Sequence, residues 1–379
     1  MVIFKRLLAF LLIILMLICI PSPLPVSASE VQLSGISAKS ACLIEAESGR
    51  VLYSKNGSAR LPMASTTKIM SAIVALESGV SLETKIKVPK EAVGIEGSSV
   101  YLKQGESVTL EMLLYALMLS SANDAAVAIA HAVSGSLDGF VALMNQRAQD
   151  LGLTDTHFTN PHGLYDDEHY TSANDLAKIM AHAMKNEDFA KITATQTKAF
   201  AREGTSSFLL TNHNKLLKTY DGVIGGKTGF TKKSGRCLVS CAERDGLKLI
   251  AVTLNAPNDW NDHKELYDFG FTSYRNVHFD SQSIKIPVIS GKSSEILAYS
   301  NPFDMVLPQN HGEISLKIYA PRFVFADVKK GEVLGDVIYY LDGKIIAISP
   351  LYASGNVANI KYKFNLFTWL MDFIKGIFD

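Results

Sequence analysis

Two strongly apolar runs that meet at residues 120–123 constrain the fold of this chain more than any other feature. The first run, LEMLLYALMLSS, covers residues 110–121, and the second, NDAAVAIAHAVSG, covers residues 123–135. Both have helical character and are too apolar for surface helices, so the sequence predicts two helices buried inside a domain. The polar residues at 120–123 interrupt the runs and are favourable caps for the second helix.

Segments rich in β-forming residues lie on both sides of these helices. A hairpin is predicted at about 41–54, and a helix over 65–78, where apolar residues recur at helical spacing until Gly79. Further helices are predicted at about 138–151 and 174–186. After them come five predicted strands, at about 196–202, 207–210, 224–231, 236–243 and 247–255. A last helix is predicted at about 259–273. Strands at both ends with helices between them indicate an antiparallel sheet covered by helices, in an α+β or three-layer arrangement.

The pattern changes from Ser283 onward, where short alternating apolar runs are broken by Gly, Asn, Asp and Pro. This pattern predicts a small all-β domain with a hairpin at Asp342-Gly343. A length of 379 residues with 47% apolar content is consistent with two folded units.

The N-terminus has the layout of a secretory signal peptide. Lys5 and Arg6 precede an apolar run of 14 residues, Leu7 to Ile20, and small residues follow around Ala28. Because a spanning helix needs about 20 apolar residues, we expect cleavage after Ala28, with an uncleaved anchor as the alternative. The predicted signal peptide is therefore 1–28, and the mature protein is exported.

The C-terminal segment 364–379 is predicted to form an amphipathic helix. Its apolar and aromatic residues fall on one helical stripe, and Trp369 is expected at a membrane interface. We expect the segment to attach the protein to the outer face of the cytoplasmic membrane, mainly by hydrophobic contact. The alternative is that it packs on its own protein or on a partner.

Charge and cysteine content narrow the possible partners. Lys+Arg and Asp+Glu both total 37 and no basic cluster is present, so nucleic acid is not predicted as a partner. Cys42, Cys237 and Cys241 remain after signal cleavage and are predicted to be buried thiols, because Cys237 and Cys241 lie about 13 Å apart along one strand. The same distance disfavours a zinc site with His263, and no metal or cofactor is predicted.

Ser65 and Lys68 are a candidate nucleophile and base. The two residues are three positions apart at the start of a predicted helix, so their side chains lie on one face and within hydrogen-bonding reach. A buried lysine with a lowered pKa can accept the proton of a serine hydroxyl, and unpaired N–H groups at the helix start can stabilise an oxyanion. An isolated S-x-x-K pattern is weak, however, because it arises by chance in chains of this size.

Two further motifs make the pattern specific. Ser121-Ala122-Asn123 lies between the two apolar helices, and Lys227-Thr228-Gly229 lies in a predicted strand. S-x-x-K, S-x-N and K-T-G in this order form the constellation of penicillin-recognising serine enzymes. Over nearly its whole length the chain resembles the D-alanyl-D-alanine carboxypeptidases, the low-molecular-weight penicillin-binding proteins. The resemblance implies a penicillin-binding-protein/β-lactamase-like transpeptidase domain, an antiparallel sheet with a helical subdomain, over 29–278, and a β-rich domain over 279–363.

The resemblance also implies roles for the catalytic residues. Ser65 is the acylated nucleophile and Lys68 its general base. Ser121 and Asn123 relay protons and bind the amide backbone of the substrate. The implied reaction removes the terminal D-alanine from peptidoglycan stem peptides through an acyl-enzyme on Ser65, and β-lactams acylate the same hydroxyl.

Substrate binding is assigned by the same resemblance to the K-T-G strand. Lys227 sets the electrostatics of the site, and Thr228 holds the terminal carboxylate. Gly229 leaves room for a peptide along the strand edge, and the N–H groups of Ser65 and Phe230 form the oxyanion hole.

Three other functions are alternatives to a carboxypeptidase. A class A β-lactamase is disfavoured because no E-x-x-L-N pattern lies between Asn123 and Lys227. A D,D-endopeptidase or weak transpeptidase stays open, because the choice of acceptor depends on the shape of the cleft. The intact motifs argue against a catalytically silent wall-binding module.

One departure from the family concerns the substrate carboxylate. Some of these carboxypeptidases have an Arg after the K-T-G strand, whereas the comparable stretch here, NAPNDWNDHKELYDFGF, has none. His263 and Lys264 are possible substitutes. His157, His162 and His169 are expected to shape the wall of the site rather than to bind a metal, and Trp260 is expected in the core.

Overall fold

The computed structural model describes residues 33, 35–202, 205–360 and 373. The predicted signal peptide and nearly all of the predicted C-terminal helix, including Trp369, lie outside this range. The chain separates into two compact units, one ending at Asn276 and the other beginning at Val277. In the described residues no single helix is both apolar and long enough to span a membrane. Among these residues, only α4 (Asn123–Ser134) and α5 (Leu137–Asp150), taken together as a bent pair, have the required length and apolar composition.

A five-stranded antiparallel sheet with strand order β2-β1-β9-β8-β7 forms the centre of the first unit. Its strands, in that order, are Val51–Lys55, Ser40–Glu45, Leu247–Leu254, Gly235–Arg244 and Val223–Thr231. The chain thus closes the sheet with strands from both ends of the unit, as the sequence predicts. The K-T-G strand β7 lies at an edge, so half of its backbone N–H and C=O groups face away from the sheet.

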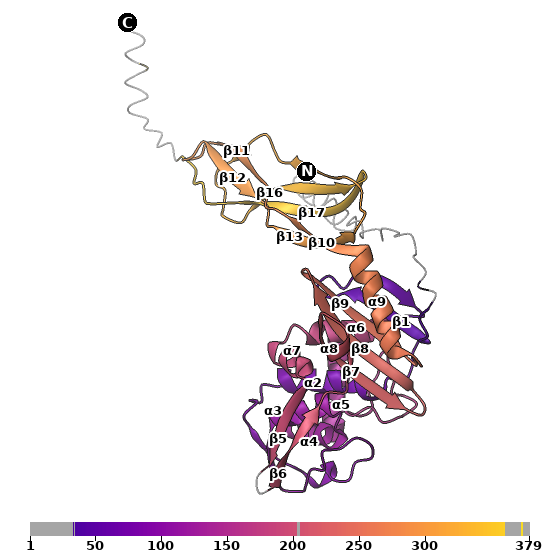
Figure 1. Ribbon diagram of the computed structural model, residues 1–379. Coiled ribbons are helices and arrows are strands. Elements are labelled where there is room, and N and C mark those ends of the chain that lie inside the picture. Colours follow the sequence, from indigo (N-terminus) through magenta and orange to yellow (C-terminus); the bar gives the residue numbers. More distant parts are fainter. Residues whose placement is uncertain (1–32, 34, 203–204, 361–372, 374–379) are drawn as a thin grey trace, which may run out of the picture. The chain divides into compact units, whose positions relative to one another are not determined.

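Helices cover both faces of this sheet (Figure 1). On one face of β9, residues such as Ile250 and Val252 pack with the buried helices. On the other face, Thr253 is directed at α9 (Asp259–Ser273). The remaining helices are η1 (Ala64–Thr67), α2 (Lys68–Glu77), η2 (Lys90–Ala92), α3 (Leu110–Leu119), α6 (Ala173–Ala183), α7 (Glu187–Ala194) and α8 (Leu216–Thr219). The apolar helices α3 and α4 are buried, which confirms the feature that most constrains the fold.

Several short elements were missed by the sequence analysis. They are α7, α8, η2 and the small hairpin of β3 (Lys85–Lys87) and β4 (Ser107–Thr109). The predicted strands near 196–210 form a separate two-stranded sheet, β5 (Thr197–Arg202) with β6 (Thr205–Thr211). The expected polar cap of α4 is wrong, because its N-cap is Ala122, which offers no side-chain hydrogen bond.

The missed helix α7 holds the K-T-G strand in place. The hydroxyl of Thr193 accepts a hydrogen bond from the Gly226 N–H and donates one to the Gly226 carbonyl, both at 2.9 Å. Since Gly226 directly precedes Lys227, this buried pair of hydrogen bonds fixes the start of the motif.

Between Val277 and Ile360 the second unit is all-β, as predicted. A six-stranded sheet has the order β14-β16-β17-β12-β11-β15, and β10 pairs with β13. The strands of these two sheets, the first of which begins in the last residues of the first unit, are β10 (Tyr274–Phe279), β11 (Ser283–Ile289), β12 (Glu295–Tyr299), β13 (Phe303–Pro308), β14 (Ile314–Tyr319), β15 (Val324–Phe325), β16 (Val333–Leu341) and β17 (Lys344–Ala353). Asp342 and Gly343, both with positive φ, form the predicted hairpin between β16 and β17.

Candidate active site

Ser65 lies in the 3-10 turn η1, and the α-helix begins only at Lys68. The predicted helix start was therefore one turn too early. Thr66 and Thr67 each donate their hydroxyl to the carbonyl three residues earlier, at 2.7 Å, which stabilises the tighter turn. Ala64 has a φ of 48°, a conformation that costs free energy for a residue with a side chain. Such strain beside Ser65 is typical of a functional site.

Lys68 is completely buried and surrounded by hydrogen-bond acceptors. Its Nζ donates to Ser65 Oγ at 3.0 Å, to Asn123 Oδ1 at 2.7 Å and to the His162 carbonyl at 2.6 Å. Burial, and secondarily the positive charge of Lys227, lower the pKa of Lys68 well below its ordinary value. When the Lys68 amine is neutral, its two N–H groups can donate to Asn123 Oδ1 and to the His162 carbonyl. The lone pair of the nitrogen is then directed at Ser65 Oγ.

The S-x-N motif lies at the junction of α3 and α4. Ser121 is buried and has a φ of 59°, a second strained residue at the site. Asn123 is fixed from two sides, because its Nδ2 donates to the Glu96 carbonyl at 2.6 Å and its backbone N–H donates to the Ser98 carbonyl at 2.7 Å. The segment 96–98, which carried no motif, thus positions the amide that contacts Lys68.

The K-T-G strand passes directly beside Ser65. A Cβ added at Gly229 would lie 2.9 Å from the Ser65 backbone nitrogen and 3.1 Å from the Ala64 Cβ, so only glycine fits here. Lys227 is buried, its Nζ donates to the Thr228 carbonyl at 3.0 Å, and burial lowers its pKa to about 7. Phe230 is 66% exposed.

The sequence-predicted residues are therefore brought together from four elements. η1 supplies Ser65, α2 supplies Lys68, the α3–α4 junction supplies Ser121 and Asn123, and β7 supplies Lys227 to Phe230. Ser65 is only half-buried, while Lys68 and Lys227 are inaccessible. A half-buried hydroxyl hydrogen-bonded to a buried amine of low pKa is the arrangement needed for nucleophilic attack by serine.

The histidine-containing loop forms a wall of the site. His162 supplies its carbonyl to Lys68, and a Cβ at Gly163 would lie 2.0 Å from the Ala64 carbonyl oxygen. The Thr159 N–H donates to His169 Nδ1 at 3.0 Å, so His169 Nε2 carries the proton and donates to Thr67 Oγ1 at 2.7 Å. Burial lowers the pKa of His169 to about 4, so the ring is neutral at physiological pH. His157 Nδ1 bonds to a carbonyl of the same loop.

α9 and the strand β8 beside it carry His263, Trp260, Cys237 and Cys241. His263 is completely buried and lies 2.7 Å from Ser240 Oγ and 3.1 Å from Thr253 Oγ1, so it does not replace the missing arginine. Cys237 and Cys241 face the opposite side of β8 from His263, which rules out the zinc arrangement considered from the sequence. Both thiols, and Cys42, are free and buried as predicted. Trp260 is only half-buried, so its placement in the core was wrong.

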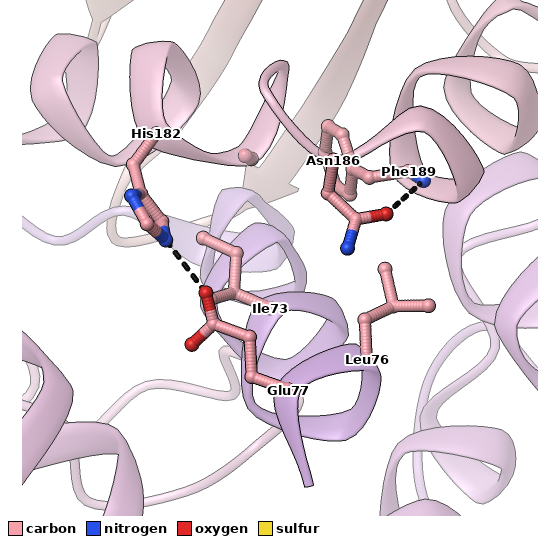
Figure 2. A pocket seen from close by; sticks show the side chains of 7 residues that line it. Ile73, Leu76, Glu77, His182, Asn186 and Phe189 are labelled. Atoms are coloured by element: carbon pink, nitrogen blue, oxygen red, sulfur yellow. Dashed lines mark hydrogen bonds and ion pairs between the residues drawn. The ribbon is translucent and has the colours of Figure 1, made fainter. Parts of the chain in front are cut away.

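A small pocket lies at the far end of α2 from Ser65. Figure 2 shows Glu77 pointing toward His182, with 2.7 Å between Glu77 Oε1 and His182 Nε2, while Asn186 caps α7 by accepting from the Phe189 N–H at 3.0 Å. The Glu77–His182 contact thus joins α2 to α6, whereas Asn186 bonds only to the backbone of the helix that it caps. Within the described residues, no group of His, Cys, Asp and Glu is arranged to hold a metal ion.

The burial of Lys227 predicts a stability cost that is independent of activity. Its folded-state pKa of about 7 lies below the ordinary 10.5, so between these pH values the folded protein binds fewer protons than the unfolded protein. The free-energy cost of burying the charged Lys227 in the folded protein is therefore fully present below about pH 7 and decreases as the pH rises toward 10.5. Lys227→Met is therefore expected to raise the free energy of unfolding by about 1–4 kcal/mol at pH 6 and by less at pH 9.5. Urea unfolding at both pH values measures this. The exposed Lys232→Met is the control, and equal destabilisation of Lys227→Met at both pH values would contradict the prediction.

Comparison with known proteins identifies the family. Residues 26–258 match the family model for peptidase S11, described as D-alanyl-D-alanine carboxypeptidase. The chain belongs to this family. Residues 273–359 match the C-terminal domain of penicillin-binding protein 5. The predicted family, the transpeptidase fold with its all-β second domain, and the class of enzyme are thereby confirmed.

Individual members of the carboxypeptidase family are similar over most of the chain. The D-alanyl-D-alanine carboxypeptidase DacF of Bacillus subtilis (strain 168) is 35% identical over 365 residues, which are 92% of this chain and 94% of the relative. The crystal structure of penicillin binding protein 5 from Haemophilus influenzae superposes with a TM-score of 0.74 at 28% identity, covering 86% of this chain and 98% of that one. A D-alanyl-D-alanine endopeptidase of Pseudomonas aeruginosa (strain PAO1) is 31% identical over 222 residues, 58% of this chain and 71% of the relative.

Proposed function

We propose that this protein removes the terminal D-alanine from peptidoglycan stem peptides through an acyl-enzyme on Ser65, and that β-lactams acylate the same hydroxyl. The observation that carries the proposal is the buried amine of Lys68, 3.0 Å from Ser65 Oγ. Family membership supports the substrate class and the location in the cell envelope.

The proposed reaction begins with neutral Lys68. Its lone pair accepts the Ser65 proton as Oγ attacks the carbonyl carbon of the penultimate D-alanine. The N–H groups of Ser65 and Phe230 stabilise the oxyanion, with Gly229 allowing the backbone of β7 to approach. The tetrahedral intermediate collapses with protonation of the leaving D-alanine nitrogen, and water then hydrolyses the ester.

The other motif residues assist this exchange. Asn123 and the His162 carbonyl fix Lys68, and Ser121 relays a proton toward the leaving nitrogen. Buried Lys227 keeps the pKa of Lys68 low and makes the β7 edge positive, while Thr228 binds the substrate carboxylate. The peptide lies antiparallel or parallel along the open edge of β7 as an added strand.

Endopeptidase activity is the second candidate function, supported by the similarity to the Pseudomonas aeruginosa endopeptidase. The two activities are separated by giving the mature protein two substrates, a diacylated Lys-D-Ala-D-Ala peptide and a cross-linked peptide dimer. We expect release of D-alanine from the first at a rate well above cleavage of the second. Cleavage of the dimer alone would overturn the carboxypeptidase assignment in favour of the endopeptidase.

Cleavage after Ala28, the domain limits at 278 and 363, and attachment through 364–379 remain predictions. The amphipathic pattern of the tail supports attachment to the outer face of the cytoplasmic membrane. Deletion of 365–379 is expected to move the protein from the membrane to the soluble fraction, with unchanged activity on a soluble peptide. Continued membrane association after the deletion would point to an uncleaved N-terminal anchor instead.

A further inference from the structure

Arg236 lies on the strand next to the K-T-G strand and on the same face as Thr228. Along the β7–β8 pair Thr228 is opposite Leu238, and Phe230 is opposite Arg236. Opposite residues of an antiparallel pair share a face and successive residues alternate, so Thr228, Phe230 and Arg236 lie together. A residue two positions along the neighbouring strand is about 7–8 Å away, within reach of a long side chain.

The guanidinium of Arg236 is held in place by α9. Its Nε and Nη2 donate to Asp259 Oδ1 at 3.0 and 2.9 Å, and its carbon lies 5.6 Å from the centre of the Trp260 ring. The Asp259 side chain is 3% exposed, whereas that of Arg236 is 42% exposed. Arginine has five N–H donors in a rigid plane, so the two that bind Asp259 orient the remaining three.

Other basic groups near β7 are poorly placed to bind a carboxylate on this face. Lys227 is on the opposite face of the strand, is buried and donates to the Thr228 carbonyl. His263 is buried, and burial lowers its pKa to about 3, so it carries no charge. Lys233 stacks on the Tyr165 ring with its Nζ 5.6 Å from the ring centre. Arg236 is thus an oriented and accessible cation beside Thr228.

We propose that Arg236 binds the terminal carboxylate of the substrate together with Thr228, supplying from β8 the cation that the segment after β9 lacks. Asp259 is a positioning residue that holds the guanidinium in the required plane. This inference rests on the proposed function, because it concerns the free carboxylate that distinguishes a carboxypeptidase substrate.

The test compares a diacylated Lys-D-Ala-D-Ala peptide with the same peptide ending in D-alaninamide. In Arg236→Gln we expect kcat/KM for the free acid to fall about 10–100-fold, mainly through KM, with little change for the amide. The preference of the wild type for the acid should therefore collapse. Arg236→Lys should recover part of this preference, and Asp259→Asn should raise KM for the acid to a smaller extent.

A matched control is Arg244→Gln, at the other end of β8 on the same face. Arg244 stacks over Tyr220 and Phe271 and donates to the Asp221 carbonyl, far along the strand from Thr228. Its replacement should leave the acid-to-amide preference unchanged. An equal loss for acid and amide in Arg236→Gln, or no loss for either, would overturn the proposal. Should Arg236→Gln fail to fold because it leaves Asp259 buried without its partner, the double variant Arg236→Gln/Asp259→Asn replaces it.

Penicillin acylation separates failure of this inference from failure of the proposed function. The wild type and Arg236→Gln are labelled with benzylpenicillin and with its methyl ester, which lacks the carboxylate. A selective loss for the free acid supports the role of Arg236 even if no peptide is hydrolysed. If the wild type does not hydrolyse the peptide at all, this result counts against the proposed function but not against the role of Arg236.

Discussion

Replacing Ser65 by alanine is expected to lower D-alanine release by roughly 10⁴-fold or more and to abolish covalent labelling by penicillin. In the proposed mechanism Ser65 Oγ supplies the oxygen of the ester, and it is the hydroxyl that lies 3.0 Å from Lys68 Nζ. The fold should be unchanged, because Ser65 is only half-buried and its side-chain hydrogen bond is to Lys68.

Ser78→Ala is a matched control for this measurement. Ser78 follows the same helix at its other end, where its hydroxyl donates to the Ala75 carbonyl at 2.7 Å. We expect Ser78→Ala to retain full acylation and hydrolysis. Release of D-alanine from the diacylated peptide and the stoichiometry of a labelled penicillin are measured for the wild type and both variants. Labelling of Ser65→Ala at the stoichiometry of the wild type would place the nucleophile elsewhere.

Much of the fold could be predicted because its elements are long and strongly patterned. The sequence places the buried helices α3 and α4 and the strands of the central sheet within a few residues. The helix α7 was missed because it is only eight residues long and begins with the polar pair Glu187-Asp188. Its role depends on a tertiary contact, the hydrogen bonds of Thr193 to Gly226. Propensity and periodicity contain no information on such a contact.

The three motifs could be recognised in the sequence because each is short and contains residues of defined chemistry. Their supporting groups could not be found in this way. The His162 and Glu96 carbonyls hold Lys68 and Asn123 through backbone atoms, which have no residue signature. The position of Arg236 beside Thr228 follows from strand register, which the sequence alone does not give. The error at the start of α2 has a similar origin, since Thr66 and Thr67 bond to local carbonyls and favour the 3-10 turn.

Replacing Lys68 by arginine is expected to lower the rate of acylation by at least about 10³-fold although both side chains are basic. A guanidinium cannot be deprotonated in a protein, so it cannot accept the Ser65 proton. Lys178→Arg, at an exposed position of α6, is the control and should acylate normally. Near-normal acylation by Lys68→Arg would show that Lys68 contributes charge rather than proton transfer.

The pH dependence of acylation provides a second, independent test of the same role. Since burial and Lys227 both lower the pKa of Lys68, the wild type should acylate at neutral pH, and its rate should fall at acid pH as Lys68 becomes protonated. Lys227→Met removes the neighbouring positive charge, so the pKa of Lys68 should rise and the acid limb should move to higher pH. Stopped-flow acylation by an uncharged β-lactam ester measures this shift without involving carboxylate binding. An acid limb at the same pH in both proteins would mean that a group other than Lys68 accepts the proton.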